Sequence, residues 1–92
     1  MNCKIDLSGT VFPSDIHDRL VASLPLPPYY GRNLDALYDV LSEVNENWNI
    51  TFVNCAQISP SLENYLENMK CVFSDAASFG SPISVKWLES DE

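Results

Sequence analysis

The chain has 92 residues, which suffice for one small domain but not for two separate hydrophobic cores. Its 13 acidic residues outnumber its 5 basic residues, so the formal net charge is −8 at pH 7. This charge argues against binding to nucleic-acid phosphates or to an anionic membrane surface, and it favours a basic partner.

The first residues lack the apolar core of a signal peptide, and no apolar run reaches the roughly 18 residues of a membrane span. We therefore expect a cytoplasmic protein. The three cysteines, Cys3, Cys55 and Cys71, are widely spaced and form no CxxC pair. Because only one histidine accompanies them, they predict buried reduced thiols, and neither a zinc site nor a disulfide framework.

The first half of the chain predicts one strand and two helices. Alternation of apolar and polar side chains predicts a strand over residues 3–7. Ser14 is the expected N-cap of an amphipathic helix over residues 14–24, which ends where prolines follow. Asn33 is the expected N-cap of a second helix, over residues 34–43, whose inner face carries leucines at helical spacing.

The second half predicts two further strands and one long helix. The β-branched and apolar run at residues 50–53 is typical of a strand that is buried on both faces. Ser59 and the proline after it predict the start of a helix over residues 60–79, either continuous or broken near Asn68. Alternation then predicts a strand over residues 83–87.

The element order is therefore β-α-α-β-α-β. Strands that are separated by helices predict an α/β fold with a parallel sheet and right-handed crossovers. We expect three strands in one sheet, packed with three or four helices. Residues 1–92 are expected to form this single domain.

Common enzyme motifs are missing from the sequence. His17, the only histidine, falls inside the first expected helix with no nucleophile marked nearby, and we expect a surface or half-buried side chain there. The three glycines form no phosphate-binding loop, and no spacing of the HExxH or EF-hand type occurs. We assign no catalytic residue, no metal ligand and no cofactor. A glycosidase-like pair of carboxylates stays open because acidic residues are plentiful, although nothing selects one pair.

The second expected helix carries an unfavourable charge pattern. Asp35, Asp39 and Glu43 recur every four residues and share one helix face. Each like-charged pair at this spacing destabilises a helix by about 0.2–0.5 kcal/mol. The helix dipole favours Asp35 in the first turn, whereas no Lys or Arg lies between Arg32 and Lys70 to offset the other two. Such a local conflict often marks a functional site.

Tyrosines flank this acidic face. Tyr29 and Tyr30 precede the helix, and Tyr38 stands next to Asp39. Tyrosine rings beside carboxylates form a surface that is complementary to a basic pocket. From the residues alone, a solvated acidic face whose tyrosines close the core is the open alternative.

The segment from Leu26 to Leu41, LPPYYGRNLDALYDVL, resembles the signature segment of the barstar family. Members of that family are intracellular inhibitors of secreted bacterial ribonucleases of the barnase type, and their element order matches the one predicted above. The resemblance implies a small barstar-like fold. It also implies that the second helix and the loops at its ends plug the active site of a ribonuclease.

The resemblance implies a role for individual residues as well. The carboxylate of Asp39 takes the place of a substrate phosphate, Tyr29 packs on a catalytic histidine, and Asp35 accepts hydrogen bonds from the enzyme. Asp75, late in the long helix, adds an ion pair. The protein-binding residues that we expect are Tyr29, Tyr30, Gly31, Asn33, Asp35, Tyr38, Asp39, Glu43, Val44 and Asp75.

The expected function is that of a non-enzymatic ribonuclease inhibitor or immunity protein, monomeric when free, that forms a 1:1 complex with a basic extracellular ribonuclease. Tyr38 and Val44 differ from the tryptophans usual in the family, which alters the rim of the expected surface. Two alternatives stay open. One is an acidic immunity or adaptor protein of the same fold that binds a different basic toxin or regulator. The other is a metal-dependent hydrolase that uses Asp35, Asp39 and Glu43.

Overall fold

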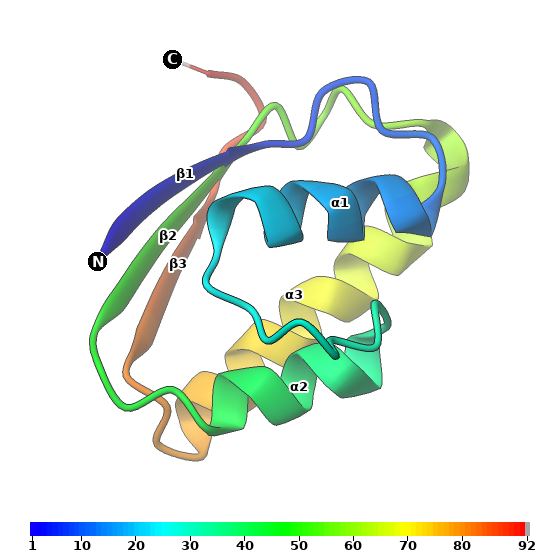
Figure 1. The fold of residues 1–92 in the computed structure, drawn as a ribbon. Helices are drawn as coiled ribbons and strands as arrows, with labels where there is room; N and C mark the ends of the chain where they lie inside the picture. The colour runs from blue at the N-terminus through cyan, green and yellow to red at the C-terminus, as the bar shows by residue number, and fades with distance from the viewer. Residues whose placement is uncertain (92) are drawn as a thin grey trace.

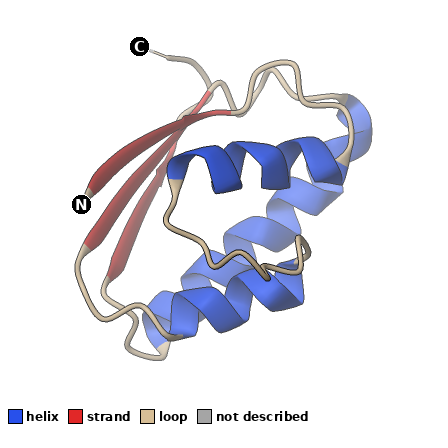
Figure 2. Cartoon of the chain, in the orientation of Figure 1, coloured by secondary structure: helices blue, strands red, loops and turns tan. Residues whose placement is uncertain are grey.

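The computed structural model describes residues 1–91 and contains three strands and three α-helices in the order β-α-α-β-α-β. The strands form one parallel sheet with the order β1-β2-β3, and the helices lie along one side of it (Figure 1, Figure 2). The predicted fold class, parallel sheet and element order are confirmed. The elements are β1 (Asn2–Asp6), α1 (Pro13–Ser23), α2 (Leu34–Ser42), β2 (Trp48–Val53), a 3-10 turn η1 (Pro60–Leu62), α3 (Glu63–Ser78) and β3 (Ile83–Trp87).

The central strand β2 is covered by helices on one face only. Ile50 and Phe52 are buried on the face that the helices cover. Because successive side chains of a strand point to opposite faces, Thr51 lies on the other face. The register places Thr51 between Lys4 and Lys86 on the other face, and both lysines are exposed. Thr51 itself is half-buried. The expectation that this strand is buried on both faces is therefore wrong at Thr51, whereas Val53, on the same face as Thr51, is buried.

Aromatic rings fill the space between the sheet and α3. The rings of Phe52 and Trp87 stack with centroids 4.3 Å apart, and Phe73 of α3 meets both of them edge-on at 5.6 Å. Aromatic pairs in such geometries add stability beyond the area that they bury. The other buried apolar side chains of the three helices include Ile16, Leu20, Leu37, Leu41, Leu66 and Met69.

The start of α1 differs from the prediction. The helix begins at Pro13, and Phe12 is its N-cap residue, so Ser14 lies inside the helix and does not cap it. The Asp15 carboxylate accepts hydrogen bonds from the backbone N–H groups of Val11 and Phe12, each at 2.9 Å. Asp15 thus caps the helix from within its first turn, a role that the serine was expected to fill.

Other boundaries shift by one to three residues. β1 ends at Asp6, one residue earlier than predicted, and β2 begins at Trp48, two residues before the predicted start at residue 50. In α3, the α-helix is continuous through Asn68, so the possible break there does not occur. A 3-10 turn precedes this helix, and the side chain of Ser59 makes no capping hydrogen bond to it.

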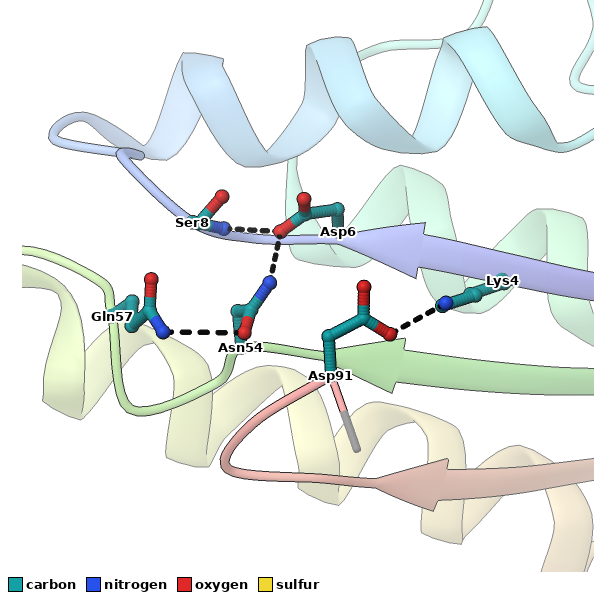
Figure 3. A network of polar contacts seen from close by, with 6 residues as sticks. All are labelled: Lys4, Asp6, Ser8, Asn54, Gln57 and Asp91. Carbon is teal, nitrogen blue, oxygen red and sulfur yellow. Dashed lines mark hydrogen bonds and ion pairs between the residues drawn. The ribbon is translucent and has the colours of Figure 1, made fainter.

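A polar network closes the carboxyl end of the sheet (Figure 3). The Asp6 carboxylate accepts hydrogen bonds from the backbone N–H of Ser8 at 2.8 Å and from the side-chain amide of Asn54 at 2.9 Å. The side-chain oxygen of Asn54, Oδ1, in turn accepts a hydrogen bond from the side-chain amide of Gln57 at 3.3 Å. These bonds hold the pKa of Asp6 at about 2, with the Asn54 bond as the largest cause. The polar groups of this network bond to one another, and we assign the network a structural role.

The three thiols lie in different environments. All are free; Cys55 is buried, Cys3 is half-buried, and Cys71 is exposed on α3. The prediction of buried thiols is therefore wrong for Cys71, which falls outside the inner stripe that carries Met69 and Phe73. Burial raises the pKa of Cys55 and of Cys3. Across residues 1–91, no helix is long and apolar enough to cross a membrane.

Candidate functional site

A groove of about 420 Å³ lies between α2 and the loop that precedes it. This groove brings together five of the ten residues expected to bind a protein, namely Tyr29, Tyr30, Gly31, Asp39 and Glu43. The rest of its lining is formed by Pro27, Ala36, Val40 and Ser42.

Local hydrogen bonds fix the loop on the helix. The backbone N–H of Tyr30 donates to the carbonyl of Pro27 at 3.0 Å, which closes a tight turn. Asn33 caps α2 as predicted, because its side-chain oxygen accepts from the Ala36 N–H at 2.8 Å, and its amide donates to the Gly31 carbonyl at 3.3 Å. A Cβ atom on Gly31 would lie 3.1 Å from that of Ala36. Glycine therefore permits the close approach between the loop and α2.

The two adjacent tyrosines point in opposite directions. Tyr29 is 82% exposed, whereas Tyr30 is 9% exposed and belongs to the core. The hydroxyl of Tyr30 lies 2.7 Å from Nδ1 of His17 on α1. Of the two rings, only that of Tyr29 is open to solvent, and Tyr30 packs beneath the loop.

His17 is fully buried, which corrects the expectation of a surface or half-buried residue. It precedes Leu20 by three residues and Leu24 by seven, so it lies on the inward face of α1. Its Nε2 atom lies 2.7 Å from the hydroxyl of Tyr65 on α3, while Nδ1 faces Tyr30. Both ring nitrogens therefore have a hydrogen-bond partner, as buried polar groups require.

Burial shifts the ionisation of this trio toward its neutral forms. Desolvation lowers the pKa of His17, and the positive charge of Arg32 lowers it further. Burial raises the pKa of Tyr30 and of Tyr65. The Tyr30–His17–Tyr65 chain of hydrogen bonds thus joins α1, the tyrosine loop and α3 without carrying a charge.

Arg32 is the only cation between residues 20 and 69, and it is turned toward α1. It adopts a left-handed backbone conformation, with φ of 57°, and its guanidinium pairs with the carboxylate of Asp18. The positive charge closest in sequence to the acidic face is therefore engaged with a neighbouring helix.

The three acidic side chains of α2 point into solvent. Asp35, Asp39 and Glu43 are all exposed, and within residues 1–91 none of their carboxylates forms an ion pair or a hydrogen bond. Asp39 and Glu43 line the groove, whereas Asp35 does not. Unlike the Asp6 network, these charges are left without partners.

The remaining expected residues do not line the groove. Tyr38 and Val44 are partly buried and pack against the hydrophobic core. Asp75 is exposed near the end of α3. The hydroxyl of Ser81 donates to the carbonyl of Leu41 at 2.8 Å, which holds the end of α3 beside the end of α2.

Residues that the sequence reasoning did not single out form part of the groove. Ala36 and Val40 precede Asp39 and Glu43 by three residues each, so they lie on the adjacent strip of the same helix. Helical spacing could have identified both of them. Pro27 lines the groove from the loop, and no pattern in the sequence marked it.

The three carboxylates of α2 are candidate metal ligands by residue type. In the part of the chain that the structure describes, no group of three or more His, Cys, Asp or Glu side chains could hold a metal ion. Asp35, Asp39 and Glu43 therefore lack the convergent arrangement that a metal-dependent hydrolase would need.

Comparison with known proteins identifies the family. The family model described as "Barstar (barnase inhibitor)" matches residues 1–87. The chain belongs to the barstar family. The resemblance inferred from the segment between Leu26 and Leu41 is thus confirmed. Part of this barstar-family chain is also similar to a protein of Bacillus subtilis (strain 168) that is named "Putative ribonuclease inhibitor YrdF". The two are 49% identical over 41 residues, which are 42% of this chain and 45% of that protein.

Proposed function

We propose that this barstar-family protein is an inhibitor that blocks the active site of a basic secreted bacterial ribonuclease. The observation that carries the proposal is the groove beside α2. Tyr29, Asp39 and Glu43 line it together, and neither carboxylate has a partner among residues 1–91. Membership of the family described as a barnase inhibitor supports the proposal.

The chemistry of the two surfaces is complementary. A ribonuclease must gather cationic groups to bind the phosphates of its substrate. A carboxylate on a rigid helix can occupy such a site without being cleaved, and Asp39 is the residue that we assign to the phosphate position. Tyr29 supplies a large exposed ring with a polar tip that can pack beside it. Residues on the opposite face of α2, Leu37 and Leu41, are fully buried and hold the helix in place.

The net charge of −8 would speed the capture of a basic enzyme. Electrostatic steering raises association rates above those of neutral pairs and weakens as salt is added. A standard interface takes about 800 Å² from each partner, about one seventh of this protein's 5313 Å² surface. We propose that the groove, the tyrosine loop and the end of α3 supply that area.

The same proposal fixes the remaining properties of the protein. It acts in the cytoplasm as a single domain, monomeric when free, and forms a 1:1 complex that protects the producing bacterium from its own toxin. It makes and breaks no covalent bond, so it is not an enzyme and requires no cofactor. The partner is a protein and not a nucleic acid, in keeping with the acidic charge.

A titration of RNA cleavage tests this function. Purified protein is added at low salt to a panel of barnase-type ribonucleases with a fluorogenic RNA substrate. We expect stoichiometric inhibition of at least one enzyme. Asp39→Ala should weaken binding by more than about 2 kcal/mol, as hot-spot residues do. The matched control is Glu63→Ala, which removes one exposed carboxylate from the first turn of α3, away from the groove.

Two results would contradict the proposal. One is the absence of inhibition by the wild-type protein across the whole panel. The other is equal inhibition by Asp39→Ala and Glu63→Ala, which would show that overall charge and not the groove carries the binding. The free energies of unfolding of both variants should lie within about 1 kcal/mol of the wild-type value, because both side chains are exposed and unpaired among the described residues. Asp39→Ala should be slightly stabilised by the loss of like-charge repulsion, and Glu63→Ala should be slightly destabilised by the loss of an acidic group from a first helical turn.

A further inference from the structure

Phe79 is the most exposed large apolar side chain in the described part of the protein, at 83%. Tyr29 follows at 82%, and the next, Phe12, is 65% exposed. Single exposed apolar residues are common, but a phenylalanine has no polar atom that water could satisfy. The position of Phe79 in the fold therefore determines whether its exposed ring can contact a partner.

The end of α3 explains why the ring has no cover. Phe79 is the C-cap residue, and its backbone N–H donates to the carbonyl of Asp75 at 3.0 Å. Gly80 follows with φ of 107°, a left-handed conformation that suits glycine and ends the helix. The chain then turns away into β3, so no later helical turn shields the ring (Figure 1).

Phe79 lies at the end of α3 that is bonded to the end of α2. It follows Asp75 by four residues, which places the two side chains on the same side of the helix end. Ser81, two residues later, bonds the Leu41 carbonyl in the last turn of α2. The end of α3 is therefore fixed against the end of α2, close in sequence to Glu43 of the groove.

We propose that Phe79 is an apolar contact residue at the edge of the partner-binding surface, and that the ribonuclease it fits carries an apolar depression beside its basic site. This inference rests on the proposed inhibitor function. On this inference the binding surface extends from the groove, which holds Tyr29, Asp39 and Glu43, to the end of α3, which carries the exposed side chains of Asp75 and Phe79. A partner with basic groups alone would leave the Phe79 ring in water.

The two kinds of contact predict different kinetic effects. Carboxylates attract the basic enzyme over a distance, so they govern the association rate and its dependence on salt. An apolar ring acts only after contact, so its loss should appear in the dissociation rate. Full burial of a phenylalanine side chain corresponds to about a tenfold to hundredfold change in affinity.

Binding kinetics of four variants test the inference, with the most strongly inhibited ribonuclease of the panel as the probe. Phe79→Ala should raise the dissociation rate about tenfold or more and leave the salt dependence of association unchanged. Phe79→Leu, which keeps an apolar side chain, should recover most of this loss. Phe12→Ala is the matched control, because that exposed phenylalanine precedes α1, outside the groove. Asp39→Ala reports on the proposed function itself.

Each outcome decides one of the two proposals. If Asp39→Ala weakens binding and Phe79→Ala behaves like Phe12→Ala, the contact role of Phe79 is overturned and the inhibitor function stands. Equal losses in Phe79→Leu and Phe79→Ala would also overturn the apolar contact. If the wild-type protein binds no ribonuclease of the panel, both proposals fall together. Matching thermal unfolding of Phe79→Ala and the wild type would confirm that the variant is folded.

Discussion

The buried histidine predicts that the protein loses stability in mildly acidic solution. In its neutral form, the His17 ring has one nitrogen that donates a hydrogen bond and one that accepts, which matches the hydroxyls of Tyr30 and Tyr65 at 2.7 Å. Protonation would make both nitrogens donors and would place a positive charge in the core. Arg32 adds a second positive charge to its surroundings.

The size of the effect follows from the direction of the pKa shift. Burial holds the pKa of His17 in the folded protein below the unfolded value of about 6.5. Unfolding therefore takes up a proton at pH values between the two, and the free energy of unfolding falls as the pH falls below about 6.5. One proton corresponds to a slope of at most about 1.4 kcal/mol per pH unit. Between pH 7.5 and 5.5 the loss amounts to up to about 1.4 kcal/mol.

Urea unfolding at pH 7.5, 6.5 and 5.5, followed by tryptophan fluorescence, measures this loss. His17→Gln is the control, because its amide cannot titrate and still carries a donor and an acceptor. We expect the stability gap between the two proteins to narrow as the pH falls, since only the wild type takes up the proton. Parallel curves for both proteins would refute the argument. A wild type that gains stability at pH 5.5 relative to the control would show that the folded state holds a charged histidine.

Three further predictions concern single contacts. Tyr65→Phe should lower the free energy of unfolding by about 1–3 kcal/mol in urea, because it leaves one ring nitrogen of His17 buried without a partner; an unchanged midpoint would contradict the bond. Asn33→Ala removes the N-cap of α2 and should lower the free energy of unfolding by about 0.5–2 kcal/mol, measured by thermal unfolding. An unchanged free energy of unfolding would show that this cap does not stabilise the protein. A thiol reagent should modify the exposed Cys71 at once and the buried Cys55 only after denaturant is added, so equal rates would contradict the described burial.

The fold could be predicted because local rules determine most of it. Asn33 caps α2, as the spacing of polar and apolar residues indicated, and alternation placed β1 and β3 to within a residue. The burial of β2 could not be predicted in the same way. An apolar run indicates that a strand is buried. It does not show that the helices cover only one face of the strand and leave Thr51 on the opposite face.

The acidic part of the candidate site could be predicted from the charge pattern of the sequence. Unbalanced carboxylates on one helix face pointed to Asp39 and Glu43, which the structure places in one groove. The directions of side chains in the loop were not predictable, because two adjacent tyrosines outside a regular element follow no periodicity. Tyr30 turns inward to His17, 13 residues away, and Tyr65 reaches the same ring from 48 residues away. Such long-range contacts leave no local pattern.

Helix α2 remains stable despite the repulsion on its acidic face because its opposite face is packed in the core. Each like-charged pair costs the helix about 0.2–0.5 kcal/mol, whereas burial of one leucine stabilises by about 1.5–3 kcal/mol. Leu37 and Leu41 are both fully buried, so packing outweighs the repulsion several times over. A lysine placed among the carboxylates would relieve that repulsion, but the gain for an exposed pair is at most about 1 kcal/mol. Such a lysine would also place a positive charge where the proposed basic ribonuclease would bind. If the proposed function holds, the cationic surface of the ribonuclease would relieve the repulsion between Asp39 and Glu43 on binding, and this would couple the stability of α2 to complex formation.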